Sequence, residues 1–139
     1  MKRDPLAAVL RLRRLAMEDA TRDFADCLRS EAETRQAVAA VEAAIERETT
    51  LASSLEGGDA VVEAFGAWLK RARKDLRAAQ SRHEQSESET ARARAALAVA
   101  RAAVKAAEHL MAEQEAAAAL EASRREQREL DEIGRKLRE

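Results

Sequence analysis

Residues that break helices or fill cores are scarce in this chain of 139 residues. It has one proline, four glycines, one tryptophan, two phenylalanines and no tyrosine. So few aromatic side chains cannot fill a globular core. Its single cysteine excludes an intrachain disulfide, which suits the cytoplasm. No stretch is apolar enough to cross a membrane, and we expect no signal peptide.

The residues that are abundant are those of long helices. Charged residues make up 37% of the chain, the formal net charge is −1, and alanine supplies most of the hydrophobic fraction. This composition is typical of coiled coils. Disorder explains it less well, because the apolar residues are periodic and alanine and arginine favour helices. The near-neutral charge argues against a nucleic-acid partner.

Glycine and proline divide the sequence into two helices. Asp4 and Pro5 form an N-cap and a first helical residue. The pair Gly57–Gly58 interrupts the helical pattern, and we expect a left-handed glycine cap there with Asp59 capping the next helix. Gly66 is the one helix-unfriendly residue just after the turn.

The sequence therefore predicts an all-α fold, an antiparallel two-helix coiled-coil hairpin with the second helix longer than the first. We expect a single domain over residues 1–139, with a helix at about 5–55, a turn at about 56–59 and a helix at about 60–137.

Heptads give each helix a seam of apolar residues. In the first helix the a and d positions are Met17, Ala20, Phe24, Cys27, Glu31, Thr34, Val38, Val41, Ile45, Glu48, Ala52 and Leu55. In the second they are Val62, Phe65, Leu69, Ala72, Leu76, Ala79, His83, Ser86, Thr90, Ala93, Leu97, Ala100, Val104, Ala107, Met111, Gln114 and Ala118. Upstream of Met17 the seam is expected to drift onto the residues that step by three, Leu6, Val9, Leu12 and Leu15.

Folding at the glycine pair brings together residues whose numbers sum to about 115. Leu10 then lies near Val104, and the polar Thr34 lies at the height of His83. The polar layer also includes Glu31 and Ser86, so matched polar groups can satisfy one another.

The second helix outruns the first under this register. The stretch from Ala112 to Glu139 has no partner and is roughly 40 Å long at 1.5 Å per residue. Such a lone helix is marginally stable in water. We expect this segment either to fray or to bind another protein.

Catalytic chemistry finds little support, and we expect neither an enzyme nor a cofactor. The two histidines, His83 and His109, are roughly 39 Å apart by helical rise, and no metal-ligand spacing occurs. Cys27 fits a small buried hydrophobe, with a redox role as the alternative. His83 fits the polar layer, with a pH switch as the alternative.

Charge and one aromatic residue mark the region after the turn. The tip is acidic, and a basic run follows, made of Lys70, Arg71, Arg73, Lys74 and Arg77. The favoured interpretation is cross-helix pairing with Glu42 and Glu46; an acidic partner, a membrane surface or nucleic acid are the alternatives. Trp68 is either a binding anchor or packing over the seam edge.

Several motifs make the chain resemble the FliJ family of the bacterial flagellar type III export apparatus. The arrangement of two long helices joined by one short turn is similar to that of the family. The spacing Phe65-x3-Leu69-x2-Ala72 and the opening with Leu12, Arg13 and Leu15 are also similar to the family's pattern. The closing Arg/Glu/Gln-rich run from Glu121 to Ile133 is also similar.

The resemblance implies a cytoplasmic protein at the inner face of the bacterial membrane, peripheral to it only through protein partners. Those partners are the hexameric export ATPase, the cytoplasmic domain of the export gate, and export chaperones. The gate-facing residues would be Phe65, Leu69 and Ala72, with Trp68 beside them. The ATPase-facing residues would be Arg124, Gln127, Leu130, Asp131 and Ile133. Family members often carry tyrosines on the first helix near the turn, where this chain has Ile45, Thr49 and Leu51.

Two alternatives remain open from the sequence. One is the equivalent stalk protein of a virulence type III secretion system. The other is a self-associating coiled-coil scaffold in which the overhanging helices pair between copies.

Overall fold

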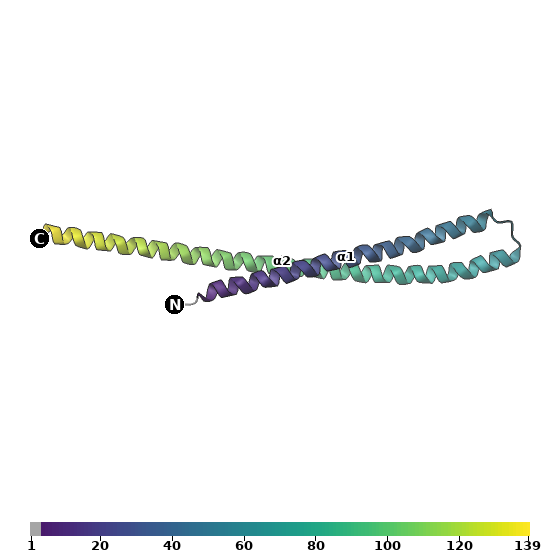
Figure 1. Cartoon of the computed structure of the whole chain (residues 1–139), viewed down its shortest axis with the longest axis horizontal. Helices are drawn as coiled ribbons and strands as arrows, with labels where there is room; N and C mark the ends of the chain where they lie inside the picture. Colours follow the sequence, from purple (N-terminus) through teal and green to yellow (C-terminus); the bar gives the residue numbers. More distant parts are fainter. Residues whose placement is uncertain (1–3) are drawn as a thin grey trace. The chain divides into compact units, whose positions relative to one another are not determined.

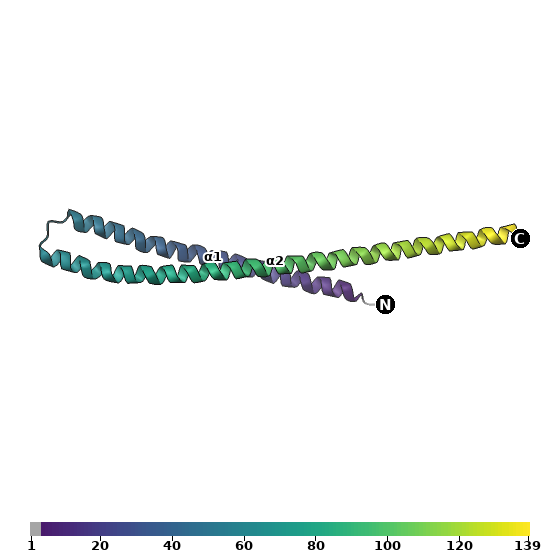
Figure 2. The same cartoon turned by 180° about the vertical axis from the view of Figure 1, so that it is seen from behind.

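Two helices account for nearly all of the computed structural model, which describes residues 4–139. Helix α1 spans Pro5–Ser54 and helix α2 spans Asp59–Arg138, with 50 and 80 residues. No strand occurs in this described range. The chain reverses direction at the turn, so α1 and α2 run antiparallel (Figures 1 and 2). The all-α two-helix fold with a longer second helix is thereby confirmed.

The chain divides into two compact units. One contains Ala20–Leu97, which includes the turn. The other contains Ala98–Glu139 together with the N-terminal residues through Asp19. We call them the turn unit and the terminal unit and describe each by itself.

In the turn unit, the helices meet along the expected heptad seam. The buried residues of α2 all occupy a or d positions: Ala72, Ala79, Ser86, Thr90 and Leu97. Most a and d positions of α1 in this unit are half-buried, including Phe24, Cys27 and Val41. Small alanines at the d positions allow the backbones to approach closely.

In the terminal unit, a small apolar cluster joins the helices. Leu10 of α1 is buried with Val104 and Ala107 of α2, and Met17 and Met111 pack against them. The expected proximity of Leu10 and Val104 is confirmed. These side chains are the whole apolar core of this unit's described residues, so its stability depends on few contacts.

The expected drift of the seam in the first turns of α1 is wrong. Val9, Leu12 and Leu15 are 40%, 66% and 52% exposed, whereas Leu10 is 7% exposed. Leu10 lies one heptad before Met17, so the original a and d phase simply continues. The three-residue spacing of these leucines and Val9 does not by itself define a buried face. Contact with α2 decides which face of α1 is buried.

The start of α1 follows the sequence rules. The backbone N–H of Leu6 donates to Asp4 Oδ1 at 3.0 Å. Asp4 is therefore the N-cap that the sequence predicts, and Pro5 is the first helical residue.

The turn works differently from the expectation. None of the glycines has a positive φ, so the left-handed cap is wrong. Asp59 is the first residue of α2 rather than its cap, and the N–H of Val61 donates to the Gly58 carbonyl at 3.1 Å. A Cβ on Gly57 would lie 2.7 Å from Val61 Cβ. Glycine is needed there because α2 comes too close, not because of backbone conformation.

Candidate partner-binding surfaces

Polar side chains form a layer inside the turn unit. Thr34 Oγ1 and His83 Nδ1 are 3.0 Å apart, which confirms the expected pairing of these residues. Thr90 donates its hydroxyl to the Cys27 carbonyl at 3.2 Å. The numbers of both pairs sum to 117 rather than 115. The register is therefore shifted by about one residue on each helix.

The other polar side chains of the layer either find partners on their own helix or have no hydrogen-bond partner. His83 Nε2 lies 2.9 Å from Glu87 on its own helix. Glu31 turns to Arg35, at 3.1 Å, instead of crossing to α2. The buried Ser86 hydroxyl has no hydrogen-bond partner. Because a buried hydroxyl stays unpaired, we expect the layer to add little stability.

Two aromatic side chains stack beside the turn. The rings of Phe65 and Trp68 have centroids 6.1 Å apart and planes inclined by 21°. Both are half-buried. They line an apolar pocket of about 420 Å³ between the ends of the helices, which we call the turn pocket; its other lining residues are Glu48, Leu51, Ala52, Leu55, Ala60, Val61 and Ala64.

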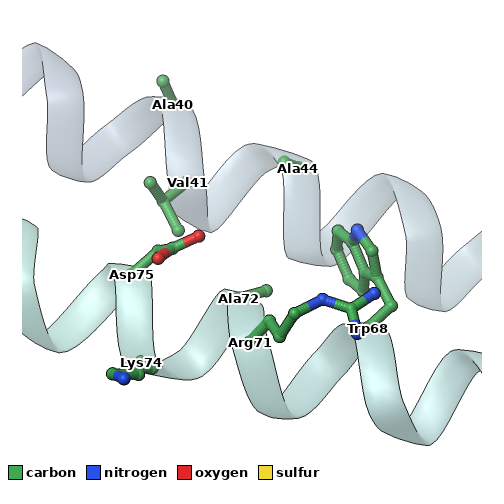
Figure 3. Close-up of a pocket in the computed structure, with 8 residues that line it drawn as sticks. All are labelled: Ala40, Val41, Ala44, Trp68, Arg71, Ala72, Lys74 and Asp75. Carbon is green, nitrogen blue, oxygen red and sulfur yellow. The ribbon is translucent and has the colours of Figure 1, made fainter.

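A groove continues from the turn pocket along the seam. It holds about 560 Å³, and Trp68 reaches from α2 toward α1 at one end of it, with Arg71 alongside (Figure 3). Ala72 forms part of its floor and is only 8% exposed. Leu69 is half-buried. Of the four expected gate-facing residues, the structure therefore brings Phe65 and Trp68 together at an accessible pocket and buries Ala72 in the seam.

Sequence reasoning missed the aliphatic part of this pocket. Leu51, Leu55 and Val61 are 52%, 54% and 37% exposed. Leu51 and Val61 each precede a seam position, and both line the turn pocket. Large apolar residues next to seam positions on both sides of the glycine pair were the available signal.

The basic run after the turn is unpaired. Within residues 4–139 no ion pair forms at Lys70, Arg71, Arg73, Lys74 or Arg77. The expected cross-helix pairing with Glu42 and Glu46 is therefore wrong. At this end of the turn unit the charged side chains extend into solvent, where a paired geometry gains little and costs side-chain entropy.

The last part of α2 is uncovered within the terminal unit. From residue 112 onward every residue is exposed except the half-buried Gly134. Leu130 and Ile133 are 62% and 55% exposed. Arg124 and Gln127 border a shallow groove with Leu120. Asp131 is exposed as well, so all five expected ATPase-facing residues are accessible.

This uncovered segment has its own apolar stripe, which the first heptad register conceals. Beyond Met111 the original seam positions become mostly polar or charged. A second set of positions instead steps by four and three along one face. Ser123 and Glu126 are the polar breaks in this set, and its apolar members are Ala112, Ala116, Ala119, Leu130, Ile133 and Leu137. Heptad spacing of this kind is the pattern of a helix that packs on another helix. We call these apolar members the C-terminal stripe.

No enclosed site accompanies these surfaces. Among residues 4–139 no group of three or more histidine, cysteine, aspartate or glutamate side chains could hold a metal ion. None of the helices in that range is long and apolar enough to span a bilayer.

The fold and surfaces define a class of protein: an antiparallel two-helix coiled coil with an apolar pocket at its turn and an uncovered C-terminal helix. The family model for the flagellar FliJ protein matches residues 1–137, so the chain belongs to the FliJ family. Proteins of this family are components of the flagellar export apparatus. No curated protein and no solved structure matches the chain significantly.

Proposed function

We propose that this protein is a non-catalytic, cytoplasmic part of the flagellar export apparatus that links the hexameric export ATPase to the export gate and handles export chaperones. The observation that carries this proposal is the family match over residues 1–137. The protein reaches the inner face of the membrane only through its protein partners.

The ATPase contact is proposed for the C-terminal segment. An uncovered helix of this length gains little stability alone, because helix propensity without packing is marginal. A partner that covers the C-terminal stripe supplies the missing packing. Arg124, Gln127 and Asp131 lie along one side of the apolar Leu130 and Ile133 and would give the contact a polar edge.

The gate contact is proposed for the turn pocket. Stacked Phe65 and Trp68 offer a large apolar surface, and aromatic anchors of this kind often dominate binding energy. Leu69 is a half-buried seam residue next to Trp68 in the sequence and is included in the proposed contact. Ala72 contributes by letting the helices approach, so its effect on gate binding is indirect.

Two variants separate these contacts. A chain that ends at Ala119 should lose at least nine-tenths of its stimulation of the export ATPase and keep its affinity for the gate domain. The variant Phe65→Ala with Trp68→Ala should weaken gate binding at least tenfold and keep ATPase stimulation. Circular dichroism checks that helicity falls only by the residues removed. Undiminished stimulation by the shortened chain would refute the role of the C-terminal segment.

A further inference from the structure

Four basic residues share one face of α2 just after the turn. Lys70, Arg73, Lys74 and Arg77 follow the spacing i, i+3, i+4, i+7, which places them together on a helix. We call them the basic face. All four are exposed, and none forms an ion pair within residues 4–139. Like charges at these spacings repel one another, so the cluster weakens the isolated helix.

The basic face points away from the aromatic side chains of the turn unit. At 3.6 residues per turn, Lys70 and Arg77 lie on nearly the opposite side of α2 from Trp68. Lys74 extends away from α1 (Figure 3). The face is therefore separate from the turn pocket, and only Lys74 borders the groove.

A glycine one turn earlier lies beside the basic face. Gly66 is exposed, its φ is not positive, and a Cβ there would meet nothing within 4 Å. Neither backbone conformation nor packing within the chain requires glycine, although it disfavours the helix relative to alanine. The absence of a side chain does allow the backbone of another molecule to approach closely.

The charges around the basic face decide the kind of partner. Glu63 lies seven residues before Lys70, and Glu84 lies seven residues after Arg77, so acids border the face at both ends. The positive stretch is roughly 10 Å long at 1.5 Å per residue. A flat anionic membrane or a nucleic-acid backbone would meet both acids as well. A short acidic segment meets only the cations.

A second copy of this chain fits poorly. An antiparallel arrangement that pairs Glu63 with Lys74 of the second copy also brings the two Lys70 residues within one helical turn of each other. Unscreened like charges at the centre of such a contact oppose it.

We propose that the basic face and Gly66 form a docking site for a helix of another protein, one that carries acidic residues over two turns and a small residue that packs on Gly66. This interaction goes beyond the proposed ATPase and gate contacts, because it uses neither the C-terminal stripe nor the turn pocket.

The test uses a designed probe and the full chain. The probe is a stapled helical peptide with four glutamates at i, i+3, i+4, i+7 and alanine one turn before them. Its control has the same composition with the glutamates spread around the helix. Fluorescence anisotropy should show the patterned peptide binding at least tenfold more tightly than the control.

Variants locate the binding to this face. Arg73→Glu with Lys74→Glu should weaken binding at least tenfold. The matched control Arg82→Glu with Arg92→Glu changes the net charge equally at exposed, unpaired arginines and should change affinity less than twofold. Gly66→Leu should weaken binding while helicity, measured by circular dichroism, stays equal or rises.

Several outcomes would overturn the proposal. Equal affinity for both peptides, no binding of the patterned peptide, or equal loss in both charge-reversal variants would each do so. Tight binding to vesicles containing anionic lipid, or a dimer in sedimentation that Arg73→Glu with Lys74→Glu abolishes, would assign the face to a different occupant.

Discussion

The two glycines at the turn are adjacent, but the structure constrains them differently. Gly57 has no room for a side chain, because an added Cβ would lie 2.7 Å from Val61 Cβ. Gly58 has open space around it and a φ that any residue can adopt. Only Gly57 is therefore required by the folded chain.

This difference predicts opposite effects of the same substitution. Gly57→Ala should lower the free energy of unfolding by about 1–3 kcal/mol, because the new methyl group displaces Val61 and the first turn of α2. Gly58→Ala should raise it by about 0.4–1 kcal/mol, because alanine restricts the unfolded chain. Urea unfolding followed by circular dichroism measures both. Equal effects would mean that the turn rearranges freely.

Along the helices, the seam was predictable because heptad spacing fixes which face of each helix is buried. Ala79, Thr90, Leu97 and Val104 are buried as their positions require. The contacts of long charged side chains were not predictable in the same way. Glu31 pairs along its own helix instead of joining the polar layer, because an i,i+4 arginine lies within easy reach.

The candidate sites were predictable to a smaller degree. Phe65 and Trp68 could be singled out from spacing and residue type. Their stacking and the pocket they share with Leu51 depend on how far α1 and α2 extend at the turn. The C-terminal stripe was present in the sequence, but it belongs to a second register that the first one obscures.

Within α1, Leu10 and Leu12 make a matched pair that tests where the seam lies. Leu10 is 7% exposed in the core of the terminal unit, and Leu12 is 66% exposed. Leu10→Ala should reduce stability by about 2–3 kcal/mol, the lower part of the range for buried leucines. Leu12→Ala should change it by less than about 0.5 kcal/mol. Hydrogen exchange of amides in residues 5–19 reports the loss, and similar effects of both substitutions would contradict the continuous heptad phase.

At the scale of the whole molecule, buried contacts are distributed unevenly along the sequence. The turn unit contains the most deeply buried residues, among them Ala79 and Thr90 at 1% and 3% exposure. The terminal unit has one small cluster around Leu10. Residues 112–138 contribute a helix without buried contacts from α1. With this distribution, burial stabilises the turn unit most, and residues 112–138 gain least from it.

Hydrogen exchange should therefore reveal three levels of protection in the isolated protein. Amides around Ala79 and Thr90 should exchange slowest, those near Leu10 faster, and those of residues 112–138 fastest, because local opening follows local burial. Adding the export ATPase should slow exchange at least tenfold in residues 112–138 and leave the turn unit unchanged. The measurement is repeated at two protein concentrations. Slow exchange of residues 112–138 without ATPase, growing with concentration, would show instead that the C-terminal stripe pairs between copies.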